Sequence, residues 1–309
     1  MIIRIFILLA FSLIFNACNG QQKTKTSESS TEERTFEMVS VPSMITEPAE
    51  RAEYLAKHYW DKYDFTDTTT IHLPEITEQA MSNFLDVLKY VKPETASASI
   101  KGMLGNAEAD STMYAYMTGL YEKYLYDPNS PVRNEELYIY VLQAMVNSTI
   151  LDDINKIRPA SLLEIAMKNR VGELATDFVY TQANGQDSKM SGIKANYLLL
   201  FFYNPDCHAC KEITDQLAAS GIVNGFLKNN GLKILCVYPD EDLAAWKNHL
   251  SYMPSGWINS YDKSLSLKND EVYDLKAIPT LYLLDKDKKV LLKDVTFNQI
   301  ENYLQTQMK

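Results

Sequence analysis

The chain has 309 residues, of which 46% are hydrophobic and 23% charged, and its formal net charge is −10 at pH 7. This length leaves room for about two domains of ordinary size. The acidic balance argues against nucleic acid as a partner, because a nucleic-acid-binding surface needs a basic stripe. Four cysteines are too few for a disulfide scaffold, and they do not form the paired clusters of a zinc ribbon. They are Cys18, Cys207, Cys210 and Cys236.

The N-terminus has the pattern of an export signal. One positive charge at Arg4 precedes an apolar stretch from Ile5 to Phe15, which is shorter than the roughly 20 residues that span a bilayer. A short apolar stretch after a positive charge is typical of a secretory signal. The stretch ends at Phe15-Asn16-Ala17-Cys18, which resembles a bacterial lipobox.

In lipoproteins of this kind the cysteine becomes the lipidated N-terminus, so the resemblance implies a signal peptide over residues 1–18 and a lipid anchor at Cys18. Asn19 follows, whereas the inner-membrane retention signal has Asp at this position. We therefore expect a protein of the cell envelope, held in the outer membrane and facing the periplasm. The alternative is an ordinary cleavage site with an incidental cysteine.

Residues 19–48 are rich in Gln, Lys, Thr, Ser and Glu, and this composition predicts a flexible linker. Residues 49–165 then show helical periodicity and predict an α-helical domain. A break at Asp127 to Pro131 separates two of its helices, and Asn134 is the expected N-cap of the second. The apolar stripes are Ala52/Leu55/Ala56/Tyr59/Trp60/Tyr63, Ile76/Ala80/Phe84/Leu88/Val91, Met113/Met117/Leu120/Tyr121/Tyr124 and Tyr138/Val141/Leu142/Met145.

We interpret these stripes as the core of a helix bundle rather than as a binding face. The stretch Arg51 to Phe65 resembles the opening of an uncharacterised helical domain that precedes thioredoxin-like domains in some bacterial lipoproteins. This resemblance implies no chemistry. His58 and His72 stand alone, and we expect surface or packing roles for them rather than metal binding.

From about residue 171 the pattern changes to alternating strands and helices. The apolar run Tyr197–Tyr203 predicts a strand buried in a sheet. With the helix and strand that follow it, this run forms a βαβ unit. Cys236, inside a predicted strand, is expected to be a buried structural residue. The predicted elements are strand 178–181, strand 197–203, helix 211–227, strand 232–238, helix 242–250, strand 280–284, strand 290–292 and helix 297–307.

The motif Cys207-His208-Ala209-Cys210 follows the buried strand directly. Two thiols three positions apart, where a strand turns into a helix, can exchange electrons with another disulfide. The first lies near the helix N-terminus, where free N–H groups favour a thiolate, and the second can close the bridge. A zinc site is the alternative, but Cys207, His208 and Cys210 supply at most three ligands. We expect no metal and no cofactor other than the redox-active disulfide.

Residues 170–309 resemble the thioredoxin superfamily, and within it the TlpA- and ResA-like thiol-disulfide oxidoreductases. The matching features are the Cys207–Cys210 motif, the lead-in at Gly172 and Ala175 to Phe178, and Ile278-Pro279-Thr280. The family's proline, which Pro279 matches, is cis and faces the dithiol. The resemblance therefore implies an α-helical N-terminal domain followed by an α/β thioredoxin-like domain, with a central mixed sheet flanked by helices.

The resemblance also assigns roles. Cys207 is expected to attack and Cys210 to resolve the mixed disulfide, while Ile278 and Pro279 hold the partner's peptide. His208, if protonated, would stabilise the thiolate beside the bound substrate. The alternatives are a simple turn at Pro279 and an exposed spacer at His208. The implied partners are protein disulfides and a thiol electron donor of unknown identity.

Three positions depart from the family's pattern. Asp206 stands where Trp usually precedes the first cysteine, and its charge disfavours a thiolate, although as an N-cap it could order the helix. Phe201 replaces the buried Asp of thioredoxin. Ile213 replaces the Glu of ResA-like proteins, with Glu212 one position away. We expect reductase or isomerase activity rather than strong oxidation.

Two other functions are compatible with parts of the sequence. A peroxidase of the same superfamily would have Thr or Ser three positions before the attacking cysteine, and Asn204 at this position counts against it. A non-enzymatic binding lipoprotein would use its helical domain and keep the thioredoxin-like domain only as a scaffold.

Overall fold

The computed structural model describes residues 34–308, of which the part from Phe36 onward belongs to one compact unit. The predicted signal peptide and the predicted lipidation site at Cys18 lie outside the described residues, as does the first half of the predicted linker 19–48. Phe36 falls within that linker range, yet its ring stacks on Tyr59 with 5.2 Å between the ring centroids. Within residues 34–308, no helix has the length and apolar character needed to cross a membrane.

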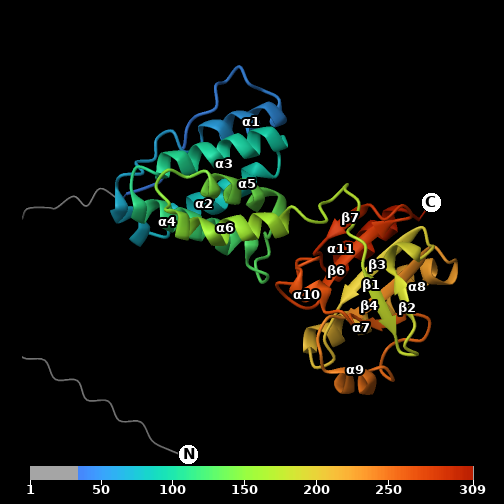
Figure 1. The fold of residues 1–309 in the computed structure, drawn as a ribbon. Helices are drawn as coiled ribbons and strands as arrows, with labels where there is room; N and C mark the ends of the chain where they lie inside the picture. Colours follow the sequence, from blue (N-terminus) through green and yellow to red (C-terminus); the bar gives the residue numbers. More distant parts are fainter. Residues whose placement is uncertain (1–33, 309) are drawn as a thin grey trace, which may run out of the picture. The chain divides into compact units, whose positions relative to one another are not determined.

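The first half of the described chain is helical, coloured blue to green in Figure 1. Side chains of Asp110, Asn134 and Asp152 cap three of the helices by accepting backbone N–H bonds. The expected N-cap at Asn134 is therefore confirmed. The elements are α1 (Pro48–His58), η1 (Thr68–His72), α2 (Thr77–Leu88), α3 (Pro93–Ala107), α4 (Ser111–Tyr121), η2 (Glu122–Tyr126), α5 (Glu135–Val146) and α6 (Asp153–Ala166).

The predicted apolar stripes contribute to one hydrophobic core in this domain. Helix α1 is shorter than its stripe, because it ends at His58 while the stripe continues to Tyr63. Trp60 is nevertheless buried, and its ring contacts those of Tyr63 and Phe84. The expectation that the helix continues along the whole stripe is corrected here. After His58 the chain leaves the helix, and packing between aromatic rings buries the rest of the stripe.

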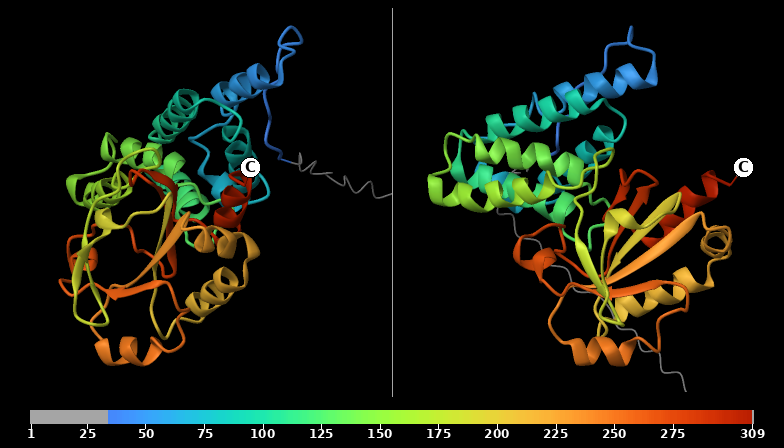
Figure 2. Two further views of the ribbon diagram at one scale, coloured as in Figure 1. Left: turned by 90° about the vertical axis from the view of Figure 1, so that its right-hand side faces the viewer. Right: turned by 45° about the vertical axis from the view of Figure 1, so that its right-hand side comes forward.

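The second half forms a sheet in the order β2-β1-β5-β4-β3-β6-β7, coloured yellow to red in Figure 2. Strand β3 pairs in parallel with β4, and β4 with β5, while the other pairs are antiparallel. The elements are β1 (Val179–Gln182), β2 (Asp187–Lys189), η3 (Met190–Gly192), β3 (Tyr197–Phe202), α7 (His208–Ala219), α8 (Gly221–Lys228), β4 (Leu232–Tyr238), α9 (Leu243–His249), β5 (Ile258–Tyr261), α10 (Ser266–Asn269), β6 (Thr280–Asp285), β7 (Val290–Lys293) and α11 (Phe297–Thr306).

Alternate residues of β3 point to opposite faces of the sheet, as the period of two requires. Leu199 and Phe201 pack beneath α7, α8, α9 and α11. Leu198 and Leu200 pack under the segment 175–193 and under residues near α10. Both faces are covered, which explains why this strand is apolar at every position.

Two details differ from the predicted elements. The single helix expected over 211–227 is two helices, because Ser220 ends α7 and its hydroxyl accepts the N–H of Val223 to begin α8. Strands β2 and β5 were not predicted. Strand β2 is largely exposed, and β5 carries the polar pair Asn259 and Ser260, so neither has the apolar pattern that identifies a strand from sequence.

A buried ionic cluster joins α5 to the sheet. The ammonium of Lys293 lies 2.5 Å from the Glu135 carboxylate and donates to the carbonyl oxygens of Ala166 at 3.0 Å and Lys168 at 2.7 Å. Burial raises the pKa of Glu135, although Lys293 and Lys276 oppose the change. The Lys293 ammonium thus donates two hydrogen bonds to the end of the helical half and forms an ion pair with Glu135.

Candidate redox site

The cysteine pair lies where the central strand gives way to a helix. Strand β3 ends at Phe202, and Cys207 is the N-cap of α7. Cys207 is half-buried, whereas Cys210 is buried one turn further along the helix. The two residues form a disulfide with their Cα atoms 5.2 Å apart. Of the two sulfurs, that of Cys207 is therefore the more accessible from outside the domain.

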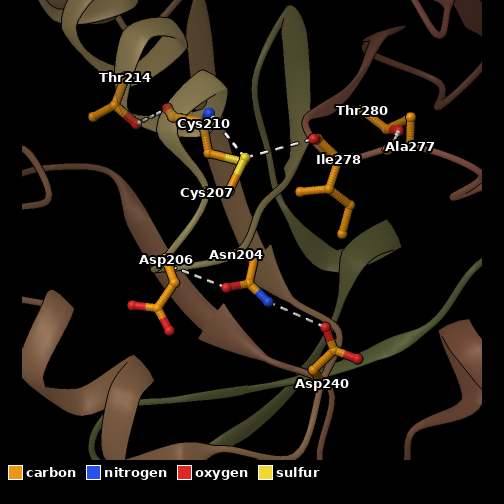
Figure 3. The surroundings of a disulfide bond; sticks show 9 residues. All are labelled: Asn204, Asp206, Cys207, Cys210, Thr214, Asp240, Ala277, Ile278 and Thr280. Atoms are coloured by element: carbon orange, nitrogen blue, oxygen red, sulfur yellow. Dashed lines mark hydrogen bonds between the residues drawn. A yellow bond between two sulfur atoms is a disulfide. The ribbon is translucent and has the colours of Figure 1, made fainter. Parts of the chain in front are cut away.

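The first sulfur faces the loop before β6, as Figure 3 shows. The Sγ of Cys207 lies 3.5 Å from the carbonyl oxygen of Ile278 and accepts the backbone N–H of Cys210 at 3.1 Å. The peptide bond between Ile278 and Pro279 is cis. The structure therefore brings together the Cys-x-x-Cys motif and the Ile-Pro-Thr motif, which are separated by about seventy positions in the sequence.

A polar network supports the loop between β3 and α7 (Figure 3). The Asn204 side chain accepts the backbone N–H of Asp206 at 3.0 Å and donates to Asp240 at 3.3 Å. Asp240 also pairs with Lys268 at 3.0 Å. Asp206 does not cap the helix, which corrects that expectation, because Cys207 itself occupies the N-cap position. The Asp206 carboxylate is therefore an exposed negative charge next to Cys207.

The His208 side chain is 86% exposed and lies 3.2 Å from the Glu212 carboxylate. This geometry does not direct the imidazole onto either sulfur. Phe201, at the position where thioredoxin has a buried Asp, lies fully within the apolar core. Behind Cys210, the hydroxyl of Thr214 donates to the Cys210 carbonyl oxygen at 2.9 Å.

A hollow of about 440 Å³ opens beside Cys207 and is lined by His249 and Tyr252 among others. The His249 ring lies between the rings of Tyr203 and Tyr252, with centroid distances of 5.8 Å and 5.2 Å. Burial lowers the pKa of His249, opposed by the charge of Asp206. Sequence reasoning missed His249 and Tyr252, because they lie at the end of α9 and just after it, and no local motif connects them to the cysteines.

The remaining thiol, Cys236, is free and fully buried in β4. Burial raises its pKa well above the ordinary value, so the thiol stays protonated and acts as an apolar packing group. This agrees with its expected structural role. Within residues 34–308, no three His, Cys, Asp or Glu side chains are grouped in a way that could hold a metal ion.

The fold and the cysteine pair together define a thioredoxin-like oxidoreductase domain. A thioredoxin-like family model matches residues 195–290, and a domain of unknown function, DUF5106, matches residues 17–169. A crystal structure of a thioredoxin-like protein from Bacteroides caccae is 48% identical, with a TM-score of 0.86. That similarity covers 89% of this chain and 99% of the Bacteroides protein.

Two curated relatives are similar over the second half of the chain. The thiol-disulfide oxidoreductase ResA of Bacillus cereus is 27% identical over 141 residues, covering 45% of this chain and 79% of the relative. ResA of Bacillus anthracis is 26% identical over 140 residues, covering 44% of this chain and 78% of that relative. The chain belongs to the thioredoxin-like family, in the branch of the TlpA- and ResA-like thiol-disulfide oxidoreductases.

Proposed function

We propose that the protein exchanges electrons with protein disulfides through Cys207 and Cys210, as a reductase or isomerase. The observation that carries this proposal is the position of the Cys207 sulfur. It lies at the tip of α7, half-buried, 3.5 Å from the carbonyl oxygen of Ile278. An incoming polypeptide can reach it there, while buried Cys210 is placed to act second.

The reaction balances within the dithiol. The thiolate of Cys207 attacks one sulfur of the substrate disulfide, forming a mixed disulfide and releasing the other substrate sulfur as a thiolate. The thiolate of Cys210 then attacks the Cys207 sulfur and releases the second substrate sulfur. Two electrons pass from the dithiol to the substrate. The Cys207–Cys210 disulfide must then be reduced by an external thiol or dithiol donor.

Three features support particular roles around this chemistry. The Cys210 N–H points at the Cys207 sulfur and would stabilise a thiolate there. Ile278 and Pro279 would bind the substrate's backbone next to its disulfide. His208 is exposed at the rim, so in this proposal it contacts bound substrate rather than the thiolate. The charge of Asp206 disfavours the thiolate, which supports reductase or isomerase activity over strong oxidation.

The test is reduction of insulin by the purified protein with dithiothreitol as electron donor. We expect Cys207→Ser to abolish catalysis, and Cys210→Ser to stall as a mixed disulfide with the substrate. Full activity in both variants would refute the redox function and favour a binding protein with a scaffold domain. A measured reduction potential as oxidising as that of DsbA, about −120 mV, would refute the proposed reductase or isomerase activity.

We further propose that the chain is exported and lipid-anchored through Cys18, in the outer membrane facing the periplasm. The apolar stretch before Phe15-Asn16-Ala17-Cys18 supports this proposal. Disulfides persist outside the cytosol, so this location suits a protein that acts on them. Palmitate labelling of the wild type and of Cys18→Ala tests the anchor, and equal labelling of the two proteins would refute it.

A further inference from the structure

A groove of about 380 Å³ adjoins the redox site at Ile278 and has walls from both halves of the chain. Tyr126, Leu162 and Ile165 of the helical domain form one side, and Leu275 and Ile278 belong to the other. Ile278 is also the residue whose carbonyl oxygen faces the Cys207 sulfur (Figure 3). Ile278 therefore borders both the groove and the sulfur that a substrate disulfide must reach.

The wall formed by residues 275–278 has open backbone groups. In the described part of the chain, the backbone N–H groups of Leu275, Ala277 and Ile278 have no hydrogen-bond partner, and neither have the carbonyl oxygens of Leu275 and Lys276. These four residues are only partly buried and belong to no helix or strand. Unpaired backbone groups of this kind can pair with an extended peptide, as a sheet edge does.

Residues that follow α6 hold the segment leading into this wall, and Glu135 of the helical domain contacts the wall itself at Lys276. The Lys168 ammonium donates to the carbonyl oxygen of Glu271 at 3.2 Å, and the Asn169 side chain donates to that of Val272 at 2.8 Å. Further along, the Lys276 ammonium lies 3.7 Å from Glu135 of α5. Because the segment is fixed at these points, the groove is formed before any peptide binds, which lowers the entropic cost of binding.

We propose that this groove binds an extended segment of the substrate protein next to its disulfide. In this arrangement the segment pairs with the backbone of residues 275–278, and an apolar side chain rests against Leu162 and Ile165. The helical domain thereby selects among disulfide substrates. The inference rests on the proposed function and adds to it the chemistry of the substrate: an extended polypeptide with an apolar residue close to the reactive cysteine.

The test compares Ile165→Glu with Ile157→Glu, a control on the same helix. Ile157 is 66% exposed and is not part of the groove. For each protein, kcat/KM is measured with insulin and with the small disulfide 5,5′-dithiobis(2-nitrobenzoate), which has no peptide backbone to pair with residues 275–278. We expect the ratio of the insulin value to the small-disulfide value to fall about tenfold in Ile165→Glu, equivalent to about 1.4 kcal/mol. The control should keep the wild-type ratio.

A ratio within twofold of wild type in Ile165→Glu would overturn the inference, and so would an equal fall in the control. If the wild-type protein reduces neither disulfide, the proposed function fails instead, so the two failures are distinguishable. A second experiment does not depend on the glutamate variant folding. A photo-crosslinking amino acid replaces Ile165 or Ile157 in the Cys210→Ser protein, with insulin B chain trapped on Cys207.

Crosslinking of position 165, but not of position 157, to the trapped B chain would support the proposal. Crosslinking of position 165 to a second copy of the protein, or to another segment of the same chain, would overturn it. Absence of any crosslink to the trapped peptide would do the same.

Discussion

Replacing Lys293 by Met should destabilise the protein strongly, because three contacts of one ammonium are lost together. The Lys293 side chain is 5% exposed, and its Nζ lies 2.5 Å from Glu135 and within 3.0 Å of two carbonyl oxygens at the end of α6. Methionine keeps much of the apolar stem but none of the donors. The Glu135 carboxylate is then left partly buried, with Lys276 at 3.7 Å as its remaining cation.

The magnitude follows from this loss. Removing one partner of a buried ion pair costs about 3–5 kcal/mol, because the other charge stays desolvated. A change of this size lowers the melting temperature by roughly 10 °C, at about 2–4 °C per kcal/mol for a chain of this size. Guanidinium unfolding followed by circular dichroism gives the free energy of unfolding, and calorimetry gives the melting temperature.

The control is Lys286→Met, which removes an exposed lysine from the tight turn before β7 and should change the free energy of unfolding by less than about 0.5 kcal/mol. The double variant with Glu135→Gln should lose much less than the sum of the two single losses, because both changes disrupt the same contact. A loss below about 1 kcal/mol in Lys293→Met, or strict additivity in the double variant, would refute the reasoning.

Three further outcomes are expected. Asp206→Asn should raise the reduction potential of the dithiol by about 10–20 mV, since removing the charge beside Cys207 favours the thiolate; equilibration with glutathione measures this, and a lower potential would contradict it. Hydrogen bonds from Lys123 and a neighbouring tyrosine lower the pKa of Glu78, so Glu78 contributes stability above about pH 4.5 that is lost as the pH falls through its lowered pKa. Glu78→Gln should therefore reduce the melting temperature more at pH 7 than at pH 3, and an equal reduction at both values would contradict the assignment. Asn134→Ala should cost about 1 kcal/mol in urea unfolding, because it leaves the N–H of the third residue of α5 without its cap; no loss would show that the cap is not stabilising.

Much of the redox domain could be predicted because its signals are local. The run Tyr197–Tyr203 is apolar at every position, and few structures other than a strand covered on both faces require that. The cysteine spacing places two sulfurs one helical turn apart, so their proximity can be predicted from local helix geometry alone. The end of α7 could not be located in this way, because Ser220 both ends that helix and caps α8, and the apolar pattern continues across it.

The site around the sulfurs depended on contacts distant in sequence. Nothing local to His249 connects it to Cys207, since it reaches the hollow only when α9 packs on the sheet. The sequence also left open whether the helical domain has any relation to the dithiol. In the structure, Lys168 and Asn169, which follow the last helix of that domain, donate hydrogen bonds to the segment that leads to Ile278. This segment connects the helical domain to the surroundings of the dithiol.

The sequence by itself determined the alternation of strands and helices in the second half, the position of the cysteine pair and the helical character of residues 49–165. These depend on periodicity and short spacings, which operate over one or two turns of chain. Only the tertiary structure decided that the Ile278 carbonyl faces Cys207, that Glu135 meets Lys293, and that the helical domain borders the groove. Such contacts join residues more than seventy positions apart, and they form only when burial of apolar surface folds the whole unit.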